Sequence, residues 1–227
     1  MSTVLESQPQ QSDEQYSPVS QLLGSHEEHQ VELVRNAAHA IGKAFWNNHY
    51  AIIGGAACNL LGSTRATGDV DVVVPRGKTP EARSLLQAET ELFHVEKRTR
   101  RTWFRSSPPV EIDILAPPGM FKEKFDPTTP TTTIDGTKIL KPALLLNAKC
   151  KSILQRGGEK QYSDAMDILF LLTWCIEHDC IPIQEEVPNI GRDFVLWFIE
   201  TSKKKIPDIA ECWEKAGFNM EKGIFTV

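Results

Sequence analysis

Residues 50–75, YAIIGGAACNLLGSTRATGDVDVVVP, decide the fold of this chain. The stretch begins with an apolar segment, residues 50–53, that predicts a strand, and it continues through Gly54 and Gly55 into a short apolar helix at residues 56–61. Glycines at a strand-to-helix turn let the backbone approach a phosphate closely, and the start of a helix offers free N–H groups. The segment therefore predicts an anion-binding turn.

Asp69 and Asp71 follow this turn within a run of valines, DVDVVV. Valine favours a buried strand, and side chains alternate between the two faces of a strand, so both carboxylates point the same way. A lone D-x-D is usually a solvated strand end or loop. Two acids on one face of a buried strand indicate a cation here, and Mg²⁺ is the simplest one that takes carboxylate oxygens. Turn and strand together fit a nucleoside triphosphate with its magnesium.

A third acid is expected from a later hairpin. Residues 110–117, VEIDILAP, alternate apolar residues with Glu111 and Asp113, which share one face of a predicted strand. Residues 101–105 predict a strand before it, and residues 106–109, SSPP, have the composition of a turn. If the second strand of this hairpin lies beside the strand of the two earlier aspartates, Asp113 completes a cluster of three carboxylates.

This combination of residues resembles the nucleotidyltransferase superfamily that has the DNA polymerase β fold. The resemblance is clear over residues 50–75 and 110–116. It is weaker over residues 138–172, which are similar to the helical part of small minimal nucleotidyltransferases of the AbiEii-like type. The residues that carry it are Gly54, Gly55, Arg65, Thr67, Asp69, Asp71 and Asp113, followed by Lys149, Arg156, Lys160, Asp164 and Asp167. One position departs from the family pattern: where Gly55 stands, the family often has a serine that can touch a phosphate.

The resemblance implies an α/β (α+β) fold, a mixed β-sheet nucleotidyltransferase core flanked by helices, with a C-terminal helical region. It implies an enzyme that transfers a nucleoside monophosphate from an NTP, with ATP as the first choice, to an acceptor hydroxyl on a small molecule, a protein or an RNA end, with pyrophosphate release. Mg²⁺ or Mn²⁺ is the expected cofactor. The expected catalytic and metal-binding residues are Asp69, Asp71 and Asp113, and the expected nucleotide-binding residues are Gly54, Gly55, Arg65, Thr67, Lys149 and Asp164. The alternative is a catalytically inactive nucleotide-binding or protein-interaction module on the same fold.

Three regions are expected along the chain. Residues 1–25 are rich in Gln, Ser, Glu and Pro, which predicts a mobile, disordered N-terminal tail. Residues 26–140 form the nucleotidyltransferase core, which begins with a helix at 28–48. Residues 141–227 form a helical region packed on the core, with helices at 141–155, 162–178, 189–203 and 207–217.

Composition narrows the class of protein. The 227 residues are 41% hydrophobic and 24% charged, which suits one globular domain, with or without a helical extension. No apolar run is long enough for a membrane span or placed to act as a signal peptide, so we expect a cytoplasmic protein without a membrane partner. The five cysteines include no CxxC pair, which favours reduced thiols. The net charge of −5 argues against an extended nucleic-acid partner.

Several charged residues have two interpretations each. Residues 97–101, KRTRR, are either a solvated turn or a phosphate-facing patch for the acceptor or the pyrophosphate. Arg65 either binds phosphate or forms a salt bridge with Asp69 or Asp71.

The predicted C-terminal helices leave a similar choice open. Lys149 is either a surface group or a contact to the β- or γ-phosphate. Asp164 and Asp167 lie three residues apart on one helix face. They either pair with Lys149 or Lys160, or cap and solvate the helix.

Overall fold

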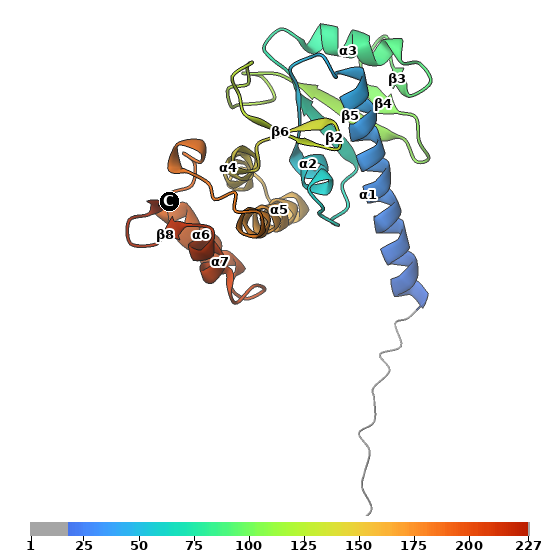
Figure 1. Cartoon of the computed structure of the whole chain (residues 1–227). Coiled ribbons are helices and arrows are strands. Elements are labelled where there is room, and N and C mark those ends of the chain that lie inside the picture. Colours follow the sequence, from blue (N-terminus) through green and yellow to red (C-terminus); the bar gives the residue numbers. More distant parts are fainter. Residues whose placement is uncertain (1–17, 227) are drawn as a thin grey trace, which may run out of the picture.

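The computed structural model describes residues 18–226, and its centre is a mixed sheet of seven strands in the order β3-β4-β5-β2-β1-β7-β6 (Figure 1). The strands are β1 Ala51–Ile53, β2 Asp69–Val73, β3 Phe93–Val95, β4 Thr102–Phe104, β5 Val110–Leu115, β6 Thr131–Ile134 and β7 Thr137–Leu140. The valines and isoleucines of β1, β2 and β5 are largely buried, as their β-branched character predicts. The mixed α/β fold class is therefore confirmed.

Helices cover the sheet and extend beyond it. The helices are α1 Pro18–Ala44, α2 Gly54–Leu60, α3 Thr79–Ala88, α4 Pro142–Ile153, α5 Gly158–Glu177, α6 Arg192–Ser202 and α7 Ile209–Lys215. Helix α1 buries its apolar stripe, which includes Val34, Ala38 and Ile41, in the common hydrophobic core. In Figure 1 α1 runs along the sheet and α3 lies at the end where β3 and β4 are found.

Strand pairing places the expected acids side by side. Strands β2 and β5 are parallel neighbours, with Asp71 opposite Asp113 and Asp69 opposite Glu111. Strand β4 pairs antiparallel with β5, so the predicted hairpin is present and its second strand does lie beside β2. Register thus puts four carboxyl groups on one face of the sheet, because paired residues share a face.

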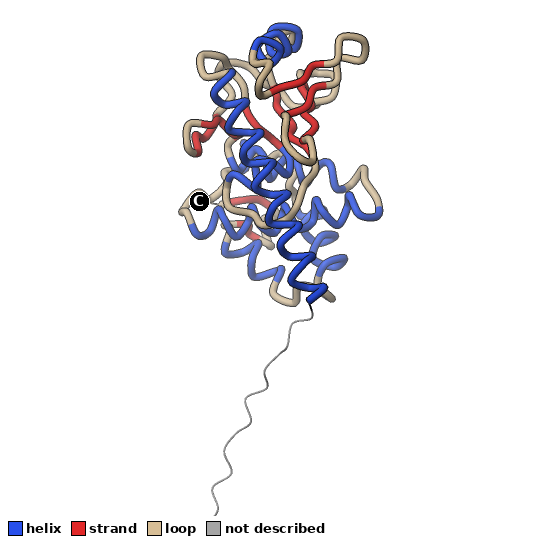
Figure 2. The backbone as a smooth tube through the Cα atoms, turned by 90° about the vertical axis from the view of Figure 1, so that its right-hand side faces the viewer, coloured by secondary structure: helices blue, strands red, loops and turns tan. Residues whose placement is uncertain are grey.

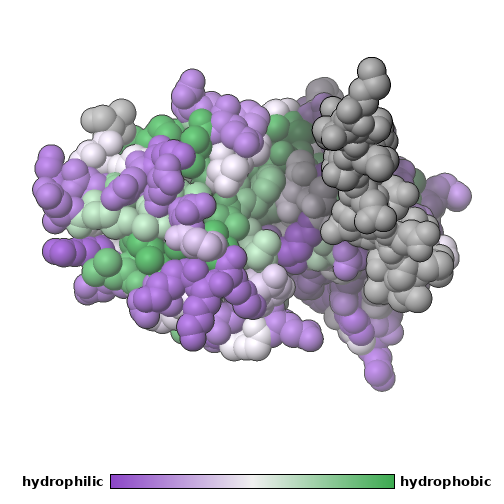
Figure 3. Space-filling model, turned by 90° about the horizontal axis from the view of Figure 1, so that it is seen from below, coloured by the Kyte–Doolittle hydropathy of each residue, from purple (hydrophilic) through white to green (hydrophobic). Residues whose placement is uncertain are grey.

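The C-terminal part of the chain packs against the sheet as a group of helices, seen below it in Figure 2. It is not wholly helical: a short 3₁₀ turn, Gln184–Glu186, and a two-stranded ribbon of β8 Phe218–Asn219 and β9 Ile224–Phe225 complete it. The ribbon packs on Trp213, which is fully buried. Seen from below, the coloured part of the surface shows hydrophobic areas interrupted by hydrophilic side chains (Figure 3).

The N-terminal prediction needs a correction. The first helix begins at Pro18 and ends at Ala44, whereas the sequence predicted 28–48. Residues 18–25 of the expected tail, residues 1–25, belong to this helix. The rest of that expected tail lies outside the described residues.

Two further sequence expectations concern cysteines and membranes. All five cysteines are free thiols; Cys58, Cys150 and Cys175 are buried and Cys180 is exposed. Burial raises the pKa of the Cys58 thiol to about 12, which makes it unreactive. Within residues 18–226, no helix has the length and apolar character that a bilayer crossing requires.

Candidate functional site

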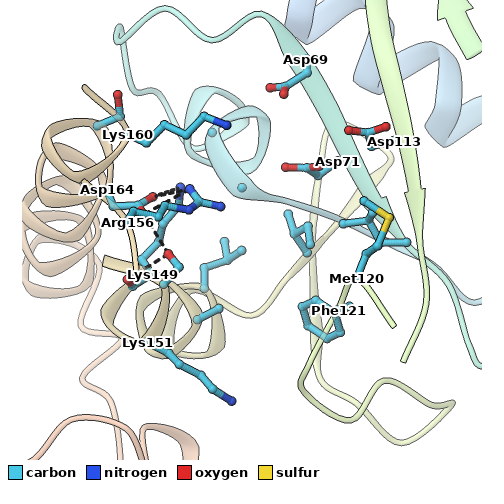
Figure 4. A pocket seen from close by; sticks show the side chains of 18 of the residues that line it. Asp69, Asp71, Asp113, Met120, Phe121, Lys149, Lys151, Arg156, Lys160 and Asp164 are labelled. Carbon is cyan, nitrogen blue, oxygen red and sulfur yellow. Dashed lines mark hydrogen bonds and ion pairs between the residues drawn. The ribbon is translucent and has the colours of Figure 1, made fainter. Parts of the chain in front are cut away.

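A cleft of about 690 Å³ separates the sheet from helices α4 and α5 (Figure 4). Strands β2 and β5 form one wall, and the two helices form the opposite wall. The loop after β5 supplies Met120 and Phe121 at the cleft margin. All nine expected site residues line this one space, although they are far apart in the chain: Gly54, Gly55, Arg65, Thr67, Asp69, Asp71, Asp113, Lys149 and Asp164.

The carboxylate wall is strongly acidic. Asp69 is exposed, whereas Asp71 and Asp113 are half-buried. Burial raises the pKa of Asp71 to about 7, and the negative charges of Asp69 and Asp113 add to the effect. Burial likewise raises the pKa of Asp113, with further contributions from Glu111 and Asp69. These carboxyls repel one another and gain from any cation that arrives between them.

The glycine turn fits closely against this wall. Gly54 has φ +68°, a left-handed conformation, and a Cβ there would lie 2.6 Å from Asp71 Oδ2. A residue with a side chain would therefore be strained and would displace the carboxylate. Gly54 keeps the backbone of the turn within reach of whatever Asp71 binds.

Gly55 explains the departure from the family's serine. A Cβ at Gly55 would lie 2.8 Å from Arg65 Nη2 and 2.9 Å from Thr67 Oγ1. The space that a serine side chain would take is thus filled by a guanidinium and a hydroxyl from the following loop. The Thr67 hydroxyl donates a hydrogen bond of 3.1 Å to Asp69 Oδ1. A hydroxyl is therefore present at this place, but it comes from Thr67.

The helical wall is built on two buried acids. Lys149 Nζ on α4 lies 2.9 Å from Asp164 Oδ1 and 2.7 Å from Asp167 Oδ2, both on α5. The two carboxylates are almost completely buried, and Ser152 donates a further hydrogen bond of 2.8 Å to Asp164. Of the alternatives for Asp164 and Asp167, pairing with Lys149 is the one observed. The Lys149 side chain is 12% exposed, so it lines the cleft as a charge that is already paired.

Arg65 has a partner that the sequence did not indicate. Its Nε and Nη2 donate hydrogen bonds of 2.7 and 2.9 Å to the two oxygens of Asp167. A salt bridge with Asp69 or Asp71, one of the two alternatives for Arg65, is therefore not the one that forms. Arg65 still lines the cleft, and Asn59 holds its backbone by donating to the Arg65 carbonyl at 2.8 Å.

Four cations that line the cleft were not among the expected site residues: Lys122, Lys151, Arg156 and Lys160. Arg156 contacts Asp164 at 3.2 Å but keeps 46% of its side chain exposed. Lys160 extends from the first turns of α5 into the cleft, facing the carboxylate wall (Figure 4). The signal that points to Lys160 was its spacing of four residues before Asp164, which puts both on one helix face.

The basic residues 97–101 lie outside this cleft, in the turn between β3 and β4. They are exposed, as the solvated-turn interpretation expects. Arg101 donates two hydrogen bonds of 2.9 Å to Glu111, and this interaction lowers the pKa of Glu111. Glu111 is therefore neutralised locally, which leaves Asp69, Asp71 and Asp113 as the unpaired acids of the wall.

The carboxylate wall fits a magnesium ion in its chemistry. Carboxylate oxygens are hard ligands, and Mg²⁺ in nucleotide sites is held by one or two carboxylates together with substrate phosphates and water. Within the described part of the chain, no group of three or more His, Cys, Asp or Glu side chains forms a ready-made metal cage. The donors here suit an ion that brings phosphate oxygens with it, as a metal–nucleotide complex does.

Comparison with known proteins finds a similar fold among solved structures but no significant match by sequence. No protein-family model matches the sequence, and no curated protein matches it significantly. Among solved structures, the chain is similar to the crystal structure of a putative nucleotidyltransferase from H. pylori. The two chains are 16% identical and align with a TM-score of 0.52 over 83% of this chain and 92% of that chain. At this identity the similarity is one of fold, and it supports the predicted fold; the AbiEii-like subtype stays a prediction.

Proposed function

We propose that this protein is a metal-dependent nucleotidyltransferase that transfers a nucleoside monophosphate from an NTP to an acceptor hydroxyl. The observation that carries the proposal is the pairing of Asp71 with Asp113 on parallel strands, on the face that opens into a cleft with cations opposite. The packing of the hydrophobic core does not require carboxyl groups at these two positions. Burial and the repulsion of neighbouring carboxylates raise the pKa values of both Asp71 and Asp113. Perturbed acids in a cleft are typical of functional sites.

Asp69, Asp71 and Asp113 are the residues that would hold Mg²⁺ or Mn²⁺. The ion would neutralise the triphosphate and lower the pKa of the acceptor hydroxyl. In the reaction, the acceptor oxygen bonds to the α-phosphorus, the bond from that phosphorus to the bridging oxygen breaks, and pyrophosphate leaves with the electron pair. Asp113, on the neighbouring strand β5, would receive the hydroxyl proton and pass it to solvent.

The remaining cleft residues bind and orient the triphosphate. Gly54 and Gly55 let it approach the backbone, and Thr67 directs a hydroxyl toward the same space. Arg156 and Lys160 are exposed cations at the helical wall, and they would contact the β- and γ-phosphates as the negative charge of pyrophosphate develops. Lys149, held by Asp164 and Asp167, adds a fixed positive charge beneath them.

The second candidate is an inactive nucleotide-binding or protein-interaction module. A module that has lost catalysis has no need for every acid of the cluster, yet Asp69, Asp71 and Asp113 are all present and all line the cleft. Catalysis is therefore the better account of these residues.

Pyrophosphate release tests the proposal. The full-length protein is incubated with mixed NTPs, Mg²⁺ and a cell extract as a pool of acceptors, with and without EDTA. The proposal expects pyrophosphate that disappears with EDTA and in Asp71→Asn. Tight NTP binding without pyrophosphate in any acceptor pool would instead establish the inactive module. Mass spectrometry of the bound nucleotide then identifies the base.

A further inference from the structure

The open face of the sheet continues beyond the three acids onto the β3–β4 hairpin. Across the strands, residue pairing places His94 opposite Trp103, Trp103 opposite Glu111, and Glu111 opposite Asp69. These four side chains form one row on one face because paired residues in a sheet share a face. The residues next to them in the same strands point to the other face, into the protein. These residues are buried: Val70, Phe93, Thr102 and Val110.

The row ends in two stacked rings and a guanidinium. The rings of His94 and Trp103 are stacked, with centroids 5.6 Å apart and planes at 21°. The Arg101 guanidinium lies 5.1 Å from the centroid of the Trp103 ring. We call His94, Trp103 and Arg101 the aromatic platform; His94 and Arg101 are exposed and Trp103 is partly so. Exposed aromatic rings on a sheet, interleaved with arginine, are the usual surface on which unpaired bases stack.

The surroundings of the platform are positively charged, although the whole chain carries −5. Lys97, Arg98, Arg100 and Arg105 are exposed next to it along the hairpin. On the other face of the hairpin, which carries Val95 and packs against α3, a recess of about 300 Å³ is lined by Arg83, Glu96, Lys97 and Arg100 among others, so it is not part of the platform.

We propose that the aromatic platform binds the unpaired end of a single-stranded nucleic acid and presents its terminal hydroxyl to Asp113. This inference rests on the proposed function and names its acceptor. Trp103 and Asp113 are diagonal neighbours on paired strands. The Cα atoms of such neighbours lie about 7–8 Å apart. A base stacked on the platform therefore has its sugar at the carboxylate wall. The several cations along the hairpin suit a strand with more than one phosphate.

This acceptor departs from the expectation drawn from net charge. The negative charge is spread over the whole chain, whereas the cations are concentrated at the hairpin. Counterion release depends on the charges that meet the phosphates and not on the sum over the protein. The platform consists of one stacked pair of rings and a guanidinium, so it takes a few terminal nucleotides and not an extended duplex.

A purely structural role is the competing explanation for the same residues. Cross-strand pairs such as His94–Trp103 and Arg101–Glu111 also stabilise an edge hairpin. The test must therefore separate binding from stability. The chain offers a matched control, because Trp174 and His178 form another stacked pair, 4.0 Å between centroids, on α5 and away from the sheet.

The experiment measures binding of a dye-labelled single-stranded oligonucleotide by fluorescence anisotropy. Trp103→Ala should weaken binding about ten-fold or more, the scale of one lost base stack, while Trp103→Phe should restore most of it. Trp174→Ala should bind as the wild type does. Magnesium–NTP affinity should stay unchanged in all of these variants. If Trp103→Ala binds the oligonucleotide like wild type, the platform is structural and the inference is overturned.

Further variants cover the case in which Trp103→Ala does not fold. His94→Ala changes an exposed ring, and it should weaken oligonucleotide binding without lowering the melting temperature. Arg100→Gln should reduce the slope of log affinity against log salt by about one, as the loss of one phosphate contact does. A free mononucleotide, or a duplex, that competes as well as the single strand would also contradict the inference.

The outcomes separate this inference from the proposed function. Oligonucleotide binding that depends on Trp103, without any nucleotide transfer, would support nucleic-acid binding by the platform and contradict the proposed nucleotidyltransferase activity. Transfer of a nucleoside monophosphate to a small molecule or a protein, without any dependence on Trp103, would support the enzyme and contradict the proposed nucleic-acid acceptor.

Discussion

Arg65 and Asp167 are 102 residues apart in the chain, yet they are joined by two hydrogen bonds of 2.7 and 2.9 Å. Arg65 belongs to the loop that leads into β2, and Asp167 lies in the middle of α5. The pair therefore ties the carboxylate wall of the cleft to its helical wall. Because Lys149 shares Asp167, one buried carboxylate holds cations from two different segments.

Asp167→Asn should destabilise the protein strongly. Removing one partner of a buried ion pair costs about 3–5 kcal/mol, since the remaining charges lose their compensation. Arg65 keeps some contact with solvent, which favours the lower end of this range. Urea unfolding measures the free energy of unfolding. The control is Glu200→Gln, which removes an exposed pair with Lys203 and should change stability by less than about 0.5 kcal/mol.

Asp71→Asn should abolish transfer and leave the melting temperature unchanged or raised. The neutral amide removes the repulsion from Asp69 and Asp113 that raises the pKa of Asp71 in the metal-free protein. Thermal unfolding and pyrophosphate release are measured on one preparation. Strong destabilisation would instead identify Asp71 as a partner in a structural ion pair.

Stability and metal binding should depend on pH in opposite directions. The pKa of Asp71 rises from 3.8 to about 7 on folding, so the folded state binds more protons than the unfolded state between these values. The metal-free protein should therefore lose stability as pH rises from 3.8 to about 7 and change little above it. Magnesium–NTP affinity should increase over the upper part of this range, because the ion needs the ionised carboxyl.

Calorimetry at several pH values checks both trends. In Asp71→Asn the part of each trend that comes from this carboxyl should disappear. A magnesium–NTP affinity that is the same at pH 6 and pH 8 would rule out Asp71 as a ligand. Equal NTP affinity with and without EDTA would show that NTP binding at this site does not need a metal ion.

Asp113→Ala should affect chemistry more than binding. Asp113 lies on β5, next to the strand that carries Asp69 and Asp71, and is proposed to serve the acceptor hydroxyl. Removing a group that acts mainly in the transition state lowers turnover and spares affinity for the ground state. We expect magnesium–NTP binding within a few-fold of wild type and transfer reduced by roughly two orders of magnitude or more. An equal loss of both would assign Asp113 to NTP binding.

Gly54→Ala should lower both stability and activity. The left-handed backbone costs a residue with a side chain about 1–2 kcal/mol, and the new Cβ would also press on Asp71 Oδ2, 2.6 Å away. Gly68→Ala is the matched control, because a Cβ there meets no atom within 4 Å. Thermal unfolding and pyrophosphate release should separate the two variants. If both behave like wild type, the turn adapts and Gly54 is not required.

The sequence determined the parts of this protein that depend on neighbours along the chain. Alternation within a strand put Asp69 and Asp71 on one face, and the spacing of apolar residues predicted α2 and the helices from α4 to α7 within a few residues of their observed ends. These features follow from backbone sterics and from the apolar side that each segment must bury. Neither depends on which other segment covers that side.

Tertiary structure decided what lies across from each of those faces. The sequence suggested the pairing of Asp113 with Asp71, but the order of strands in the sheet established it. The partner of Arg65 and the exposure of Arg156 depend on how α4 and α5 pack, and no local pattern encodes that packing. Charged side chains are long and pair with whichever opposite charge the fold brings near. Their partners are therefore fixed by contacts between distant segments, whereas strands and helices are fixed by contacts within them.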